Sequence, residues 1–307
     1  MTNSPIDVLD CKVADRFRSL AVEHASVLPD TVPSEIVALD SAMRDWRKPA
    51  LMRDFGPAFT VLWRKLREPL TPQQRRSFVL FYLASKALQI EAVLERRSLT
   101  PALIARYPLA LTRLADVLEN PPEKYDLDNE LFVKDFRMLQ GLGLPAGAAI
   151  LDIRSATGGT ILQGIACRSP LWVARTCGKV PCFRLYLDPR YLEDFNRDGM
   201  HAYYRETAEL LIKHPDVYGF VCRSWFMDPQ LESISPRLSH LTRVPLSAGA
   251  FVINRSASEK DIERATRTSY TRKRLYDAGE YKPMSSSLVW PRKAMIAWAT
   301  SQTAPYI

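Results

Sequence analysis

The fold is decided by residues 182–231, CFRLYLDPRYLEDFNRDGMHAYYRETAELLIKHPDVYGFVCRSWFMDPQL. The first part alternates and predicts a β-strand; an amphipathic helix follows, and then a second strand rich in aromatic and β-branched residues. This order is typical of a sheet with helices packed on it. Where such a helix begins, its first backbone N–H groups point beyond the end of the preceding strand and favour an anion.

The second strand of this stretch is expected over residues 217–227. Both of its faces are apolar under the period-two rule, which predicts a central strand. Arg223 and Ser224 are neighbours near its end, so their side chains point to opposite sides of the sheet. With Trp225, which is expected in the core or in the wall of a cleft, they are candidate substrate-binding residues.

The turn before the helix reads NRDGMH and provides the candidate anion site, with Asn196, Arg197, Gly199 and His201 as its residues. A glycine placed just before a helix lets a phosphate approach the backbone closely. We therefore expect Gly199→Val to block a ligand and to leave thermal stability largely intact. The imidazole of His201 is a candidate for contact with phosphate or substrate; the alternative is an exposed histidine in the first helical turn.

Asp228 follows the second strand and precedes a proline. A carboxylate at the end of a strand, beside a cleft, acts as a general base if its surroundings raise its pKa. The alternative is a helix cap, with Pro229 at the first helical position. Local sequence favours the cap, and both roles stay open.

The whole stretch resembles the core of GNAT-fold acyltransferases. In that family a strand precedes a Q/R-x-x-G-x-G/A turn that holds the pyrophosphate of coenzyme A; the matching positions here are Asn196, Gly199 and His201, of which the glycine agrees. The segment SWFMDPQL, residues 224–231, resembles the S-W-[LF]-x-[DN]-P-x-L stretch of acyltransferase-like bacterial proteins. The resemblance covers about residues 145–295.

This resemblance implies an acyltransferase that moves an acyl group from coenzyme A or a carrier-protein thioester to a small amine or hydroxyl acceptor. Asp228 or His201 would be the base, and the turn at Asn196, Arg197, Gly199 and His201 would hold the cofactor. The alternative is a non-enzymatic GNAT-like scaffold that binds a small anionic ligand or a protein partner.

Upstream of this region the pattern is helical. Residues 35–118 are expected to be almost wholly helical, and two helices open on the pairs Thr71–Pro72 and Thr100–Pro101, a cap followed by proline at the first position. The Pro- and acid-rich segment 120–129 reads as a linker. The sequence thus predicts an α+β fold, with a helical region over 1–125 packed on a GNAT-like mixed α/β sheet domain over 126–307.

The C-terminal part contains a basic segment, IERATRTSYTRKRLYDAG, residues 262–279, which is expected as one helix ending at Gly279. Its charges favour a solvated face, with the tail of an anionic cofactor or nucleic acid as alternatives. The net charge of +8 is the only support for nucleic acid, and no motif adds to it.

The remaining signals concern location and metals. Five cysteines without regular spacing predict free thiols in a reducing compartment. The N-terminus has no signal-peptide pattern, and the longest apolar stretch, FVLFYLA at 78–84, is too short to span a bilayer. No spacing of metal ligands is present. We therefore expect a cytoplasmic protein that has no metal site and does not interact with a membrane.

Overall fold

The computed structural model describes residues 6–32, 39, 57–147, 149–156, 181–188, 190 and 192–303. The chain divides into two compact units, Met1–Pro145 and Ala146–Ile307. Predictions for residues 40–56, for the loop at 157–160 and for Cys167 and Cys177 lie outside the described residues.

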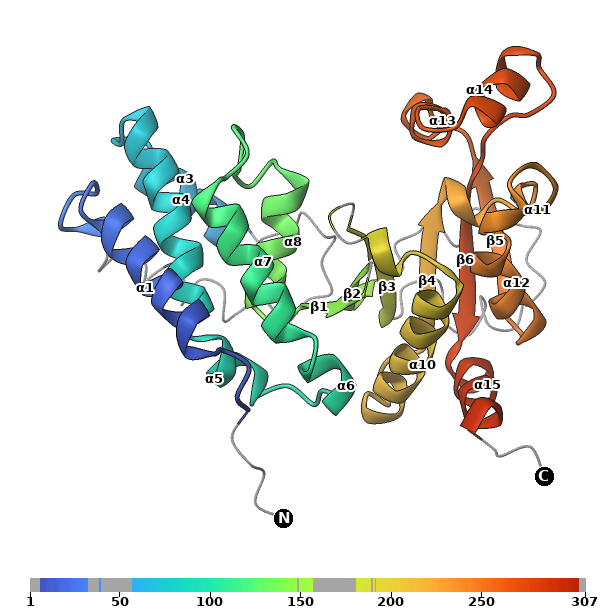
Figure 1. Ribbon diagram of the computed structural model, residues 1–307, viewed down its shortest axis with the longest axis horizontal. Helices are drawn as coiled ribbons and strands as arrows, with labels where there is room; N and C mark the ends of the chain where they lie inside the picture. The colour runs from blue at the N-terminus through green and yellow to red at the C-terminus, as the bar shows by residue number, and fades with distance from the viewer. Residues whose placement is uncertain are drawn as a thin grey trace. The chain divides into compact units, whose positions relative to one another are not determined.

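The first unit is a set of helices, as predicted (Figure 1). Both expected caps are present, because Thr71 accepts a hydrogen bond from the backbone of Gln74 in a capping box and Thr100 accepts one from Leu103. The helices described are α1 Cys11–Ala25, α3 Pro57–Arg67, α4 Pro72–Ala87, α5 Ile90–Leu94, α6 Pro101–Ile104, α7 Tyr107–Glu119 and α8 Glu130–Leu139.

Helix α8 belongs to this first unit, whereas the sequence prediction assigned residues from 126 onward to the sheet domain. The reason is aromatic packing. Phe132 and Phe136 of α8 lie 5.8 Å and 5.9 Å, between ring centroids, from Trp63 and Tyr82 respectively. The hydrophobic face of α8 therefore completes the core of the helical unit.

The sheet has six strands in the order β1-β2-β3-β4-β6-β5. β3 and β4 run parallel, joined by a helical crossover, while β4 with β6 and β5 with β6 run antiparallel. The mixed sheet confirms the α+β class. The strands are β1 Gly143–Ala146, β2 Ala149–Ala156, β3 Pro181–Leu187, β4 Gly219–Ser224, β5 Phe251–Ser256 and β6 Ser285–Pro291.

Strand β4 is central and buried, as predicted, but it is shorter than the expected span of 217–227. It ends at Ser224, and Trp225–Met227 form a 3-10 turn, η3. The sequence prediction missed the end of the strand, because the hydrophobic run continues into the turn and a buried turn and a buried strand have the same composition.

Helices of the second unit follow the strands. The basic segment 262–279 is two helices rather than one, because Ser269 caps a new helix with a side chain that accepts from the backbone of Arg272. The helices are α10 Arg197–Lys213, α11 Leu231–Ile234, α12 His240–Ser247, α13 Glu259–Thr266, α14 Tyr270–Asp277 and α15 Arg292–Thr303, with 3-10 turns η2 Leu192–Asp194 and η4 Pro236–Leu238.

An aromatic cluster fixes α10 and α15 to the sheet. Tyr204 of α10 lies 5.9 Å from Phe220 of β4 and 5.5 Å from Trp290 of β6, and Trp298 of α15 lies 5.1 Å from Trp290. The Trp290 indole N–H donates to the carbonyl of Ala248 at 3.0 Å. This cluster is the core of the second unit and positions the residues that start α10.

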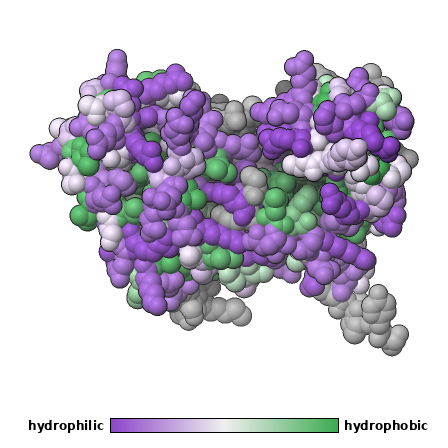
Figure 2. Space-filling model, turned by 45° about the horizontal axis from the view of Figure 1, so that its top comes forward, coloured by the Kyte–Doolittle hydropathy of each residue, from purple (hydrophilic) through white to green (hydrophobic). Residues whose placement is uncertain are grey.

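Hydrophilic residues cover most of the face drawn in Figure 2. Among the helices that the structure describes, none combines the length and the apolar character that crossing a membrane requires.

Candidate functional site

The first element of the candidate site is the place where β3 and β4 separate. The two parallel strands pair only at Phe183 with Phe220 and Arg184 with Val221, and the backbone N–H of Tyr218 donates to Pro181 just before them. All of these contacts lie near the amino ends of the strands. Toward their carboxyl ends, the described residues of β3 and β4 are no longer paired with each other.

Each strand nevertheless keeps its other neighbour. β2 stays paired with β3 as far as Leu187, and β6 stays paired with β4 as far as Ser224. The divergence is therefore not fraying at a sheet end. We call the facing edges of 185–187 and 222–224, which are not paired with each other, the diverging edge.

The start of α10 lies beside the end of β4. Phe195, just before the helix, contacts Phe226, just after β4, with ring centroids 5.5 Å apart. Asn196 is the N-cap, and its side-chain oxygen accepts from the backbone N–H of Gly199 at 2.9 Å. The predicted residues Asn196, Arg197, Gly199 and His201 are therefore brought together in one helical turn.

Gly199 differs from its prediction in two respects. It lies inside the first turn of α10 rather than before it. A Cβ atom at this position would sit 2.2 Å from the backbone oxygen of Asp194, closer than real Cβ atoms approach another atom. The glycine is therefore required by the fold itself, and Gly199→Val is not a pure probe of ligand approach.

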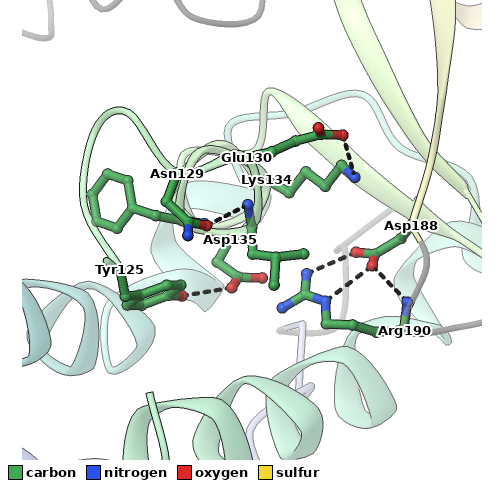
Figure 3. Close-up of polar contacts among 9 residues, drawn as sticks. Tyr125, Asn129, Glu130, Lys134, Asp135, Asp188 and Arg190 are labelled. Atoms are coloured by element: carbon green, nitrogen blue, oxygen red, sulfur yellow. Dashed lines mark hydrogen bonds and ion pairs between the residues drawn. The ribbon is translucent and has the colours of Figure 1, made fainter. Parts of the chain in front are cut away.

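The loop between β3 and α10 is braced by a buried ion pair (Figure 3). Asp188, which is fully buried, accepts from Nε of Arg190 at 2.9 Å and from its Nη2 at 2.7 Å. A bidentate pair of this kind is the strong form of a salt bridge. Figure 3 also draws a pair of the first unit, in which the hydroxyl of Tyr125 donates to Asp135.

A pocket of about 420 Å³ opens between α10, α12 and α15. Such a volume is in the range of small-molecule and cofactor sites. Basic and aromatic side chains gather in it, together with one carboxylate. It is lined by Arg197, Asp198, Met200, His201, Tyr204, His240, Val244, Ser247, Trp298 and Gln302.

His240 is one of the pocket residues that the sequence prediction did not include. Its Nδ1 lies 2.9 Å from the carbonyl oxygen of Arg237, and because a carbonyl only accepts, Nδ1 carries the proton. Nε2 then holds the lone pair of the neutral ring and has no hydrogen-bond partner among the described residues. Burial lowers the pKa of His240, the hydrogen bond to Arg237 raises it, and the nearby Arg197 cation lowers it further.

Asp228 lies elsewhere, at the end of η3, and does not line this pocket. It is 1% exposed, and its carboxylate accepts from the backbone N–H groups of Gln230 and Met284, each at 3.2 Å. The first bond caps the turn that leads into α11, and the second fastens the segment before β6. These contacts favour the capping role that the sequence analysis left open.

Asp228→Asn is expected to lower the free energy of unfolding by about 1–3 kcal/mol, because an amide offers one acceptor oxygen where the carboxylate offers two to buried N–H groups. Urea denaturation of the purified variant measures this loss. A matched change at an exposed carboxylate, Asp277→Asn, should leave stability within about 0.5 kcal/mol of the wild type. Equal stability of wild type and Asp228→Asn would contradict the capping role.

The three predicted substrate-binding residues surround the end of β4. Arg223 is exposed, and its guanidinium donates to the hydroxyl of Ser256 at 2.8 Å. Ser224 lies opposite Ser286 of β6. Trp225 is half-buried, and the guanidinium of Arg272 lies over its ring, 4.7 Å from the centroid.

The described residues contain no group of three or more histidine, cysteine, aspartate or glutamate side chains that could hold a metal ion. Comparison with models of known protein families gave no match, and neither curated proteins nor solved structures gave a significant one.

Proposed function

We propose that this protein is an acyltransferase, which moves an acyl group from coenzyme A or a carrier-protein thioester to a small amine or hydroxyl acceptor. The observation that carries the proposal is the diverging edge. Beyond the pairs Phe183 with Phe220 and Arg184 with Val221, the described residues of β3 and β4 are no longer paired with each other. The amide groups of a pantetheine arm can pair with such an edge in the manner of an added strand.

The crossover from β3 through α10 to β4 supports a GNAT-like arrangement. In the family that the sequence resembles, the strand leads into a turn and a helix start that hold the pyrophosphate. Here the helix start adjoins the diverging edge through the contact between Phe195 and Phe226. A single ligand that enters between the strands and bends over the helix start would therefore meet both features.

The pocket suits the charged end of such a donor. Arg197, His201 and His240 present basic groups from two helices, and Trp298 offers an aromatic face 5.1 Å from the ring of His201. Phosphate groups would lie against the basic side chains, and an adenine ring would stack on the indole. A carrier-protein donor would use the diverging edge in the same way.

Acyl transfer requires positioning, a base for the incoming nucleophile and donors for the developing oxyanion. Backbone N–H groups at the end of β4 are the donors in this proposal. The candidate bases are His201 at the start of α10 and Asp228 at the end of η3.

The second candidate is a scaffold that binds a small anionic ligand or a protein partner without reaction. One observation favours it. The side chain of Asn196 already occupies the N–H of Gly199, a donor that a pyrophosphate at this turn would use. Under this alternative the pocket would bind an anion and no thioester would be turned over.

Calorimetric titration with coenzyme A tests the proposal. We expect saturable binding that Arg197→Ala weakens by about tenfold, the loss of one charge-assisted contact, with Arg205→Ala on the same helix as the matched control. Incubation with acetyl-coenzyme A and a panel of amines then separates the two candidates, since only the acyltransferase releases free thiol. Absence of coenzyme A binding would overturn the acyltransferase proposal.

The affinity for coenzyme A is expected to rise as the pH falls from about 7.5 to about 5.5, because a bound phosphate stabilises protonated His240. Because the folded protein lowers the pKa of His240, the ring is neutral at the upper pH. Binding of the phosphate at that pH is therefore coupled to the uptake of a proton by the ring. Asp198 and His201 also line the pocket, and phosphate titrates near pH ~6. The measurement is therefore the difference in pH dependence between wild type and His240→Gln; identical profiles would exclude His240 from the phosphate site.

A further inference from the structure

Arg272 of α14 is a buried cation held by neutral groups. Arg272 is only 2% exposed. Nε donates to the backbone oxygen of Ala265 at 2.5 Å, and Nη1 donates to the hydroxyl of Ser235 at 3.1 Å. These two bonds tie α14 to α13 and to the turn before η4, and they fix the plane of the guanidinium.

No carboxylate of the described residues forms an ion pair with Arg272, whereas Arg16 and Arg190 both have one. Burying a cation without a counter-ion is costly. A second cation, Arg237, affects Arg272 electrostatically. Burial lowers the pKa of Arg272, the phenol of Tyr281 raises it, and Arg237 lowers it again.

The remaining nitrogen, Nη2, has no hydrogen-bond partner among the described residues. The guanidinium lies over the indole of Trp225, 4.7 Å from the ring centroid. Trp225 is half-buried and directly follows Ser224, the last residue of β4. An oriented and uncompensated charge is therefore present beside the end of the strand that borders the diverging edge.

We propose that Arg272 and Trp225 form a recognition site for a single carboxylate of a small organic ligand. A guanidinium is the donor best suited to a carboxylate, and Arg272 has one nitrogen left to give. A carboxylate would place a negative charge beside the buried guanidinium, which forms no ion pair among the described residues. This assignment rests on the proposed function: the ligand is the acyl acceptor, and it carries a carboxylate in addition to its amine or hydroxyl group.

The site is tested on the full chain labelled with 5-fluorotryptophan, with propionate as the probe and ¹⁹F NMR as the readout. The resonance of Trp225 is identified by its loss in Trp225→Phe. We expect propionate to shift this resonance with saturation and propionamide, its neutral isostere, to leave it unmoved. Both probes are compared on the wild-type protein, and the Trp225→Phe variant serves only to identify the resonance. Equal effects of the two probes, or no saturable shift, would overturn the proposal.

Variants then test whether Arg272 provides the positive charge that binds the carboxylate. Arg272→Lys should weaken propionate binding by about tenfold or more, since a lysine keeps the charge and loses the oriented planar donor. Arg274→Met, on the same helix and exposed, should bind as the wild type does. Wild-type affinity in a folded Arg272→Lys protein would overturn the assignment.

Titration of the same samples with coenzyme A separates this proposal from the proposed function. Absence of propionate binding to the wild-type protein, with coenzyme A binding intact, would refute the Arg272 site alone. Carboxylate binding without coenzyme A binding would support the Arg272 site and refute the acyltransferase.

Discussion

Trp290→Ala is expected to lower the free energy of unfolding of the second unit by about 3–5 kcal/mol, the usual cost of deleting a large buried aromatic side chain. Trp290 is fully buried in β6, and its indole contacts Tyr204 and Trp298. Removing it also leaves the carbonyl of Ala248 without its donor. The loss thus combines a cavity with an unsatisfied polar group.

Urea denaturation followed by circular dichroism measures this change, with the transition of the second unit fitted separately from the first. Trp225→Ala is the matched control. Its indole is partly exposed, so the loss should be clearly smaller than at Trp290. Equal losses at the two tryptophans would contradict the packing described for the sheet.

Gly199→Val is expected to destabilise the second unit by at least the 1–3 kcal/mol that is typical of overpacking. A Cβ at this position would collide with the backbone oxygen of Asp194 at 2.2 Å, and backbone cannot move aside as a flexible side chain can. To relieve this collision, the start of α10 must shift away from η2. The variant should therefore lose stability even when no ligand is present.

Thermal and urea denaturation of Gly199→Val check this expectation. Ala202→Val, one turn further along α10, is the control, because it adds a β-branched side chain to the same helix at a cost below about 1 kcal/mol. A Gly199→Val protein as stable as this control would contradict the requirement for a glycine at this position.

Local sequence signals were sufficient for most of the elements. Thr71 and Thr100 marked helix starts because a hydroxyl cap followed by proline specifies one conformation. The alternation in 181–187 and the aromatic and β-branched residues around Gly219 marked β3 and β4. Each of these signals depends on a few neighbouring residues, so the sequence alone contained it.

Features that depend on distant contacts were not predictable. The position of α8 depends on packing against Trp63. The burial of Arg272 was not predictable either, since it is an arginine in a run of exposed basic residues.

The candidate site was predictable in the same partial way. Asn196, Arg197, Gly199 and His201 are near in sequence, so their meeting in one turn follows from the helix itself. His240 joins the pocket only because α12 packs beside α10, where the hydroxyl of Tyr204 donates to the carbonyl of Leu241. No local pattern around His240 could have indicated this.

Hydrogen exchange with and without coenzyme A tests the central claim most directly, because the claim concerns backbone groups at the diverging edge. If pantetheine pairs with that edge, coenzyme A should slow amide exchange in 185–187 and 222–224, and at the first turn of α10. The helices of the first unit should exchange at unchanged rates. Coenzyme A that binds without slowing exchange at 185–187 and 222–224 would contradict the account.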